Sequence, residues 1–291
     1  MQKFPEIKVF GVGGSGCKVA DMLRYKQYNS VEFYLVGSDN ELYQSTCNNK
    51  IVLGSMPTAE EKDLLKAAVK GADLVVLTAG MGGRFGSEVT HLIAEIAKDI
   101  CVPTVAAVCV PFSFEDGTRL KNSKKGLKVL REKADMTIAV QCDKIQEVVP
   151  ESMSMSGALR YVDAVLFEAL NSIISPVVKS SLINLDFEDL LFAIRGAGSV
   201  YFGVGIGGGS EKAVDAVNHA AHNTLSETAF ENADKLIVRV EGADLNLKEM
   251  EAAANAVMEL VAPTATVMFS ADINESLKNE VRVSILASKK A

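Results

Sequence analysis

Residues that build disulfide frameworks or zinc sites are scarce in this 291-residue sequence. None of the cysteines belongs to a CxxC pair, and their odd number cannot form a closed set of disulfides. Only three histidines occur, and none lies at metal-ligand spacing from a cysteine. We therefore expect reduced thiols, a cytoplasmic location and no metal site built from these residues. The cysteines are Cys17, Cys47, Cys101, Cys109 and Cys142.

Signals for membranes and nucleic acids are also missing. The first residues, MQKFPEIKVF, lack the apolar core of a signal peptide, and no run of about 18 apolar residues occurs elsewhere. The net charge of −7 argues against a general nucleic-acid binder, which usually carries a basic face. With 48% hydrophobic residues, the chain can build one large domain or two ordinary ones. We expect a soluble protein that inserts into no membrane and binds no nucleic acid.

Apolar, β-branched runs alternate with helical patterns through roughly the first 145 residues. Runs that are apolar on consecutive positions are typical of strands covered by helices on both faces of a parallel sheet. We interpret residues 1–153 as a doubly wound α/β domain of the Rossmann type, with ligands at the carboxyl ends of its strands. The predicted strands are Ile7–Phe10, Val31–Val36, Lys50–Leu53, Leu74–Leu77, Thr104–Val110 and Met136–Val140, and the predicted helices are Lys18–Lys26, Ala59–Lys70 and Ser87–Asp99.

The pattern changes in the second half. Apolar residues recur at helical spacing from Ser156 to Ile174, which predicts a long central helix within residues 154–179. Residues 180–291 mix helices with strands, which predicts a smaller α+β domain. Its last two strands flank one short polar connection, Asp272–Asn279, so part of this sheet should be mixed or antiparallel. The predicted helices are Phe187–Ile194, Glu211–His222 and Leu247–Leu260, and the strands are Val200–Val204, Leu236–Val240, Thr264–Phe269 and Val281–Leu286.

A glycine-rich loop, Gly11-Val-Gly13-Gly14-Ser15-Gly16, follows the first strand and opens the first helix. Glycines there let backbone N–H groups approach a phosphate, and the helix N-terminus adds a favourable field. The pattern also fits a GxGxxG dinucleotide fingerprint, with Asp39 placed to bind a ribose hydroxyl. A tight strand–helix turn that binds nothing is the alternative.

A second glycine-rich loop follows the fourth strand, with the sequence Ala79-Gly80-Met81-Gly82-Gly83-Arg84-Phe85-Gly86-Ser87. Two such loops on one sheet can hold two parts of a polyphosphate. A nicotinamide dehydrogenase has no use for the second loop, and the chain places no histidine or lysine as its catalytic partner. The two loops together favour a nucleotide polyphosphate.

Five segments resemble bacterial and archaeal FtsZ of the tubulin superfamily, in the same order over nearly the whole chain: IKVFGVGGSG, GADLVVLTAGMGG, VPFSFED, LINLDFEDL and DINESLKNEVRV. The resemblance implies a GTPase domain, a cytoskeletal role in cell division, and GTP or GDP with Mg²⁺ as ligands. It also implies filaments formed by self-association or with other FtsZ-type subunits. By this resemblance the nucleotide would lie on Gly13, Gly14, Ser15, Gly16, Asp39, Gly82, Gly83, Arg84, Gly86, Ser87, Glu115, Arg119 and Asp163.

The segment 182–189 matches the catalytic loop of that family. There Asn184, Asp186 and Asp189 would enter the nucleotide pocket of the next subunit, where the carboxylates would polarise the water that attacks the γ-phosphate. Without the resemblance, Asp186 and Asp189 would be ordinary acids favoured by a helix N-terminus.

Several positions depart from the family pattern, and all of them concern the nucleotide pocket. Glu88 replaces the last glycine of the signature loop, where a carboxylate about 4 Å from a phosphate charge costs ~1 kcal/mol in water and ~4 kcal/mol at a surface-like dielectric. Arg84 lies beside the bulky Phe85, and we consider three roles for its side chain. It could donate to a phosphate, fill the site itself, or pair with Glu88. Between Gly54 and Gly71 the loop that senses the γ-phosphate has no counterpart.

The central helix and the first loop differ as well. Ala164 aligns with the family's guanine-reading aspartate, and Asp163 is the residue before it. On a helix, a step of one residue turns the direction of the side chain by about 100°. Leu159 replaces a guanine-stacking phenylalanine, for which Tyr161 is the alternative, and Lys18 replaces an asparagine. These departures leave open a degenerate paralogue, with weak or no GTP binding and hydrolysis, that acts as a structural or regulatory partner of FtsZ-type filaments.

Overall fold

The computed structural model describes residues 4–43, 45–54, 57–222, 225–226, 228, 230 and 233–289. Its first half contains the strands β1 (Ile7–Val12), β2 (Val31–Gly37), β3 (Lys50–Val52), β4 (Leu74–Gly80), β5 (Thr104–Val110) and β6 (Met136–Gln141). They pair in parallel in the order β3-β2-β1-β4-β5-β6. The central strands β1 and β4 are almost entirely buried, as expected for strands covered by helices on both faces.

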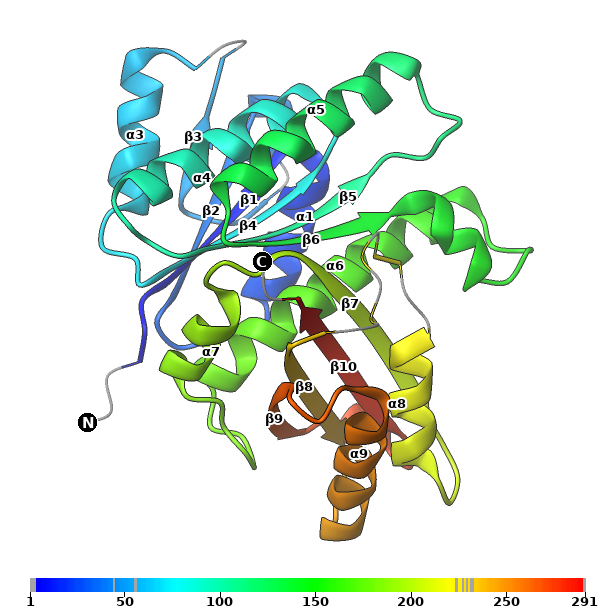
Figure 1. Cartoon of the computed structure of the whole chain (residues 1–291). Helices are drawn as coiled ribbons and strands as arrows, with labels where there is room; N and C mark the ends of the chain where they lie inside the picture. Colours follow the sequence, from blue (N-terminus) through cyan, green and yellow to red (C-terminus); the bar gives the residue numbers. More distant parts are fainter. Residues whose placement is uncertain are drawn as a thin grey trace.

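The helices of the first half are α1 (Gly13–Arg24), α2 (Asp39–Leu42), α3 (Ala59–Val69), α4 (Thr90–Asp99) and α5 (Gly117–Lys133), and the central helix is α6 (Met155–Val178). In Figure 1, α3, α4 and α5 lie on one face of the parallel sheet, and α1 and α6 lie on the other. The buried side chains on each face form a separate core. A π-helical turn, η1 (Phe85–Val89), leads into α4, and a 3-10 turn, η2 (Cys142–Glu147), follows β6. The doubly wound arrangement predicted from the sequence is confirmed.

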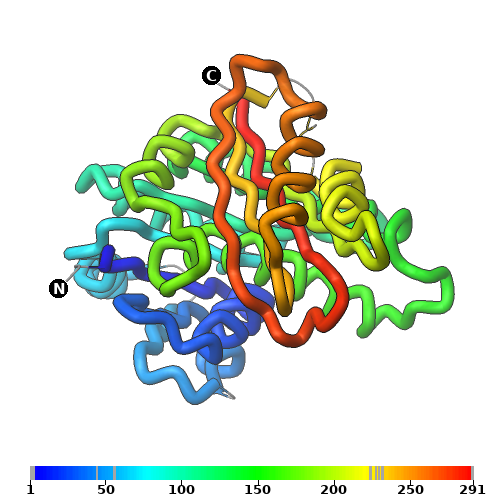
Figure 2. Tube along the Cα trace, turned by 90° about the horizontal axis from the view of Figure 1, so that it is seen from below, coloured from blue at the N-terminus to red at the C-terminus, as the bar shows by residue number. Residues whose placement is uncertain are grey.

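The second half contains α7 (Phe187–Ile194), β7 (Gly198–Gly207), α8 (Lys212–His222), β8 (Lys235–Gly242), α9 (Leu247–Leu260), β9 (Thr266–Ile273), η3 (Glu275–Leu277) and β10 (Val281–Ser288). β7 joins the two halves, because its first residues pair in parallel with β6 and the rest pairs with β10. β10 is antiparallel to β7 and β8, whereas β8 and β9 are parallel, so the sheet is mixed as predicted. In Figure 2 these strands lie across the first half, with α8 and α9 packed on their outer face.

The long helix α6 lies between the two halves and contacts α1 on one side and β9 and β10 on the other. By length and composition α6 is the one described helix that would suit a membrane span. However, 78% of its most apolar stretch is buried inside the protein, and a core helix passes the same test.

The patterns in the sequence do not predict every element. They miss α5 altogether, and they start the first helix at Lys18, whereas α1 begins at Gly13. They also start the helix after the second glycine loop at Ser87, where the structure has the π-helical turn η1 before α4. The domain boundaries after residues 153 and 179 stay predictions.

Candidate functional site

The two glycine loops lie side by side at the carboxyl edge of the parallel sheet. β1 and β4 are neighbouring strands, and their last paired residues are Val12 and Ala79. The first loop therefore leaves the sheet beside the second, and the helices α1 and η1 start from the same edge. This placement is the one that phosphate-binding loops of open α/β sheets share.

Two of the glycines allow a helix to lie directly on a strand. A Cβ added at Gly16 would come within 2.1 Å of the Thr78 carbonyl oxygen, and one at Gly86 within 1.9 Å of the Gly80 carbonyl oxygen. Any side chain at either position would push α1 or η1 away from β4. These glycines are required by the packing, whatever the site binds.

Other glycines shape the loop backbone. Gly13 and Gly82 have φ values of +69° and +100°, which residues with a side chain rarely adopt. At Gly83 an added Cβ would meet no atom within 4 Å, so this part of the second loop is open to a ligand.

In the first loop a backbone amide is already engaged by a carboxylate of the protein. The Gly14 N–H donates to Oε1 of Glu41 at 3.2 Å. The other carboxylate oxygen, Oε2, accepts from the Ser38 N–H at 2.9 Å and from the Ser38 hydroxyl at 2.8 Å. Asp39, which we predicted to approach the ligand, is exposed at the start of α2. The acid that reaches the loop is thus Glu41, which the motif analysis missed.

The second loop is also closed by one of its own side chains. The buried Ser87 hydroxyl accepts from the Gly82 N–H at 2.8 Å. Phe85 is buried in the core formed with α3, α4 and α5.

Arg84 and Glu88, the two unusual charges of this loop, do not pair with each other in the part of the chain that the structure describes. The Arg84 guanidinium stacks 4.7 Å from the Phe85 ring and donates to the Gly54 carbonyl at 3.4 Å. Glu88 lines a cavity of about 290 Å³ between η1 and α5, across from Lys125. The predicted Arg84–Glu88 pair is therefore wrong.

The first half of α6 completes the wall beside the first loop. The Ser15 hydroxyl donates to Oδ1 of Asp163 at 3.2 Å and lies 4.0 Å from the Cys109 thiol. Burial raises the pKa of the Asp163 carboxyl, whereas the Ser15 hydroxyl and the Lys18 ammonium lower it. Asp163 therefore faces the glycine loop despite the offset of one residue that the sequence comparison suggested.

The neighbouring residues of α6 point elsewhere. Ala164 and Tyr161 line a separate cavity of about 480 Å³ between α6 and the strands β7 and β10. The idea that Tyr161 replaces the base-stacking aromatic residue is therefore wrong, because its ring lies on a different side of the helix from Asp163.

Glu115 and Arg119 bind each other beside the second loop. The Arg119 Nε lies 3.2 Å from Oε2 of Glu115, whose Oε1 accepts from the Phe112 N–H at 3.0 Å. The backbone oxygen of Arg119 comes within 3.0 Å of a Cβ built at Gly82, so the first turn of α5 packs on the loop. The predicted residues of both loops, of α5 and of α6 thus gather at one edge of the sheet.

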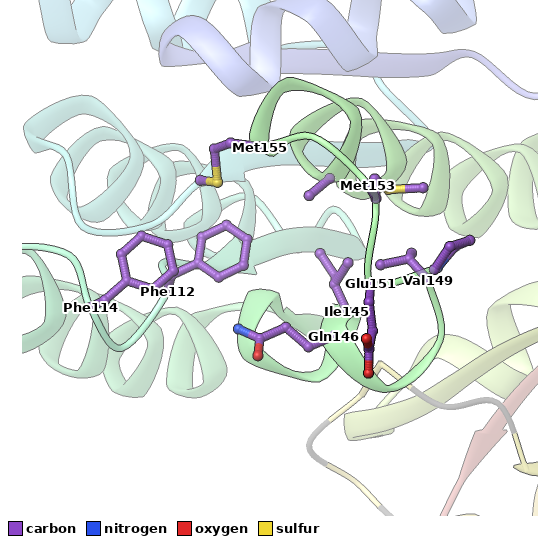
Figure 3. Close-up of a pocket in the computed structure, with 10 residues that line it drawn as sticks. Phe112, Phe114, Ile145, Gln146, Val149, Glu151, Met153 and Met155 are labelled. Carbon is purple, nitrogen blue, oxygen red and sulfur yellow. The ribbon is translucent and has the colours of Figure 1, made fainter.

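A pocket of about 520 Å³, apolar except for Gln146 and Glu151, borders this site between the β5–α5 connection and the start of α6 (Figure 3). The rings of Phe112 and Phe114 stack at 4.9 Å on one side of it. Met153 and Met155 lie on the side formed by the segment that enters α6, and Ile145 lies on η2. The pocket offers an apolar wall next to Glu115.

The loop that holds Asn184, Asp186 and Asp189 lies at the other end of α6. Oδ1 of Asn184 accepts from the Ser181 N–H at 2.8 Å, and Oδ1 of Asp186 caps α7 by accepting from the Glu188 N–H at 3.3 Å. Two hydrogen bonds of 3.1 Å between Ile183 and Ala271 fix the loop to β9. All three predicted catalytic side chains are exposed.

This loop and the glycine loops are too far apart to meet in one subunit. The segment of α6 between Asp163 and Val178 alone is about 22 Å long at 1.5 Å per residue.

The five cysteines are free thiols, and the described residues hold no group of three or more His, Cys, Asp or Glu side chains that could bind a metal ion.

Comparison with known proteins shows the family to which these features belong. Residues 48–150 match the Tubulin/FtsZ family, GTPase domain, and residues 198–289 match the FtsZ family, C-terminal domain. The cell division protein FtsZ of Mycoplasmopsis pulmonis is 32% identical over 97% of this chain and 76% of its own length. The chain belongs to the FtsZ family. FtsZ 1 of Archaeoglobus fulgidus is 31% identical, over 97% of this chain and 81% of that protein.

Solved structures extend the likeness of this FtsZ-family chain to three dimensions. The empty FtsZ dimer of M. jannaschii superposes with a TM-score of 0.92 at 28% identity, over 99% of this chain and 89% of that one. CetZ2 of Haloferax volcanii, solved as a protofilament with bound GTPγS, gives 0.78 at 17% identity, over 98% and 93%, and so shows the fold alone. The predicted FtsZ/tubulin fold and family are confirmed.

Proposed function

We propose that this FtsZ-family protein is a cytoplasmic, GTP-binding cytoskeletal protein that assembles head to tail, with GTP hydrolysis completed at the contact between subunits. The observation that carries the proposal is the separation of the two glycine loops from Asn184, Asp186 and Asp189 by the length of α6. Parts of one active site at opposite ends of a subunit can meet only when the next subunit stacks on it. Such a heterologous contact builds filaments.

The residues at the glycine loops suit a nucleotide polyphosphate. The Ser15 hydroxyl and the open backbone at Gly83 would face phosphate groups. Glu115 and Arg119 would meet the ribose and the base, and the Phe112–Phe114 pair would give the base an apolar wall. The carboxylates of Asp186 and Asp189, from the next subunit, would orient the attacking water, with Mg²⁺ neutralising the phosphates.

Relatives support assembly as the role. One solved relative is an FtsZ dimer, another structure of the same fold is a protofilament with bound GTPγS, and the curated relatives are cell division proteins. We extend self-association and a place in cell division to this chain on that basis.

The test is the release of phosphate from Mg-GTP over a range of protein concentrations. Assembly-dependent hydrolysis predicts a specific activity that rises with concentration. A flat specific activity, or none at all, would contradict the enzymatic part of the proposal.

A mixing experiment tests the shared site directly. Asp186→Ala removes a carboxylate from the loop, and Gly83→Asp adds one to the pocket at a place where a side chain meets no atom within 4 Å. Each variant alone should be inactive, and an equal mixture should recover about a quarter of the wild-type rate, because one contact in four pairs an intact pocket with an intact loop. If both variants stay inactive when mixed, although both still form filaments, the site is not shared.

A second function deserves a test because both glycine loops have an amide bound by a side chain of the protein, at Gly14 and Gly82. A structural or regulatory partner of FtsZ-type filaments that needs no nucleotide would tolerate such closed loops. Acid extraction of the purified protein, followed by anion-exchange chromatography, separates the two functions. Recovery of near-stoichiometric GDP or GTP excludes the nucleotide-free form.

A further inference from the structure

Glu41 links the first glycine loop to the turn after β2. Its side chain occupies the third position of α2 and accepts from both polar groups of the N-cap residue Ser38 through Oε2. The remaining oxygen, Oε1, reaches away from α2 to the Gly14 N–H at 3.2 Å. It also lies 3.7 Å from a Cβ built at Gly13. Glu41 is thus both a helix cap and a ligand of the loop.

The contact repeats what a phosphate would do at this point. A phosphate binds such a loop by accepting hydrogen bonds from backbone amides at the helix N-terminus, and an ionised carboxylate is an acceptor of the same kind. A phosphate and Glu41 cannot both accept from the Gly14 amide along the same direction. They also carry charges of the same sign, so their proximity is unfavourable.

Two other helices in the described part of the chain have a glutamate that caps the helix from its third position. Glu61 of α3 accepts from the Thr58 N–H at 2.7 Å and, like Glu41, also from a glycine amide, the Gly54 N–H, at 2.8 Å, so what distinguishes Glu41 is that its glycine belongs to the first glycine loop. Glu249 occupies the same position of α9, where it caps Asn246 and forms an ion pair with Lys212 at 2.9 Å. Among the described residues no Lys, Arg or His forms an ion pair with Glu41. Its carboxylate therefore faces solvent and the hydrogen-bond donors of Ser38 and Gly14.

We infer that Glu41 is an internal competitor for the phosphates of the nucleotide, whose carboxylate must leave Gly14 before a phosphate can take its place. The inference rests on the proposed binding of GTP at these loops. Because the Glu41 side chain is exposed, it can turn into solvent without unfolding the site. Glu41 therefore weakens binding without blocking it, and it weakens GTP binding more than nucleoside binding, because only the phosphates compete.

The test is a comparison of Glu41→Gln with the wild-type protein by fluorescence titration with mant-GTP, mant-GDP and mant-guanosine. Glutamine keeps the size and an acceptor for the cap but removes the charge. We expect about tenfold tighter binding of mant-GTP or more, with no change for mant-guanosine beyond twofold. The control Glu249→Gln makes the same change on α9 and should leave all three affinities unchanged.

The outcomes separate this inference from the proposed function. If wild type binds mant-GTP and Glu41→Gln binds it equally or more weakly, Glu41 does not compete, although the proposed function stands. If Glu41→Gln binds mant-GTP more weakly than the wild type in Mg²⁺ but not in EDTA, Glu41 is a metal ligand instead, and the inference is again overturned. If neither protein binds mant-GTP while both melt cooperatively, the inference fails together with the proposed function.

Discussion

Removing Arg239 should destabilise the protein far more than removing a surface charge, because Arg239 holds a buried charge cluster between α6 and the strands β8, β9 and β10. The Arg239 side chain is 3% exposed, and its guanidinium lies 3.0 Å from Glu241 and 2.9 Å from Asp272. Glu241 is 5% exposed and reaches Arg282 at 3.7 Å, and Arg282 binds Glu168 of α6 at 2.9 Å. The chain of contacts joins β8, β9 and β10 to the central helix.

The magnitude follows from the charges that Arg239→Ala would leave behind. Glu241 and Asp272 would lose their nearest cation while they stay largely buried. Breaking a buried pair in this way costs about 3–5 kcal/mol, which is a large share of the roughly 5–15 kcal/mol that stabilises a typical domain. We therefore expect Arg239→Ala to lower the free energy of unfolding by about 3–5 kcal/mol.

Equilibrium unfolding in urea, followed by circular dichroism, measures this loss. The triple variant Arg239→Met, Glu241→Leu, Asp272→Leu removes the charges together and should unfold within about 2 kcal/mol of the wild type, since apolar replacement of a whole buried cluster is often neutral. A loss below 1 kcal/mol for Arg239→Ala would refute the reasoning. So would a triple variant as unstable as the single one.

Three further changes test other parts of the structure. Gly86→Ala puts a Cβ within 1.9 Å of the Gly80 carbonyl and should cost about 3 kcal/mol or more, whereas Gly83→Ala, with no atom within 4 Å, should cost under 1 kcal/mol in the same thermal or urea melts. Tyr28→Phe leaves Oδ1 of the buried Asn171 without its 2.5 Å donor and should cost about 1–3 kcal/mol by urea unfolding. Asp163→Asn should melt at a higher temperature than wild type at neutral pH. Burial raises the pKa of Asp163 above its usual 3.8, so the folded state binds the proton more tightly and loses stability as the pH rises through the raised pKa.

Each of these predictions has a contrary result. Equal melting of Gly86→Ala and Gly83→Ala would mean that the helix η1 does not need to lie so close to β4. A Tyr28→Phe variant as stable as wild type would mean that another donor reaches Asn171. The advantage of Asp163→Asn should shrink as the pH falls toward 3.8, and an advantage that does not change with pH would point to a cause other than ionisation.

The strands were predictable because apolar, β-branched runs mark them even where a charged residue such as Lys8 or Glu32 interrupts the run, but α5 was not. Its buried positions are Ser123, Gly126, Leu127 and Leu130, so small residues interrupt the apolar stripe, and most of the remaining side chains are charged. The position of Gly126 requires a glycine, because a Cβ there would come within 2.8 Å of the Ser87 backbone oxygen. A helix that packs through glycine and serine gives no hydrophobic signal in the sequence.

The candidate site was predictable in outline for a similar reason. Motifs place the two glycine loops correctly, because strand–loop–helix order fixes them at one edge of the sheet. A shift of one residue in the alignment changes the direction in which a helical side chain points. Only the structure therefore distinguishes Asp163, which faces Ser15, from Ala164. The Glu41 contact with Gly14 spans 27 residues and two elements, and the only local signal was the cap sequence Ser38-x-x-Glu41.

The close approach of α1 and η1 to β4 has a consequence for how such sequences are interpreted across evolution. Selection for stability alone would preserve Gly16 and Gly86, since any larger residue would separate helix from strand. A lineage could thus lose its nucleotide and still display both glycine fingerprints for a long time. Positions such as Gly83, where a side chain would meet no atom within 4 Å and which we propose faces the nucleotide, would change first. Such positions are the better record of whether a member of this family still uses GTP.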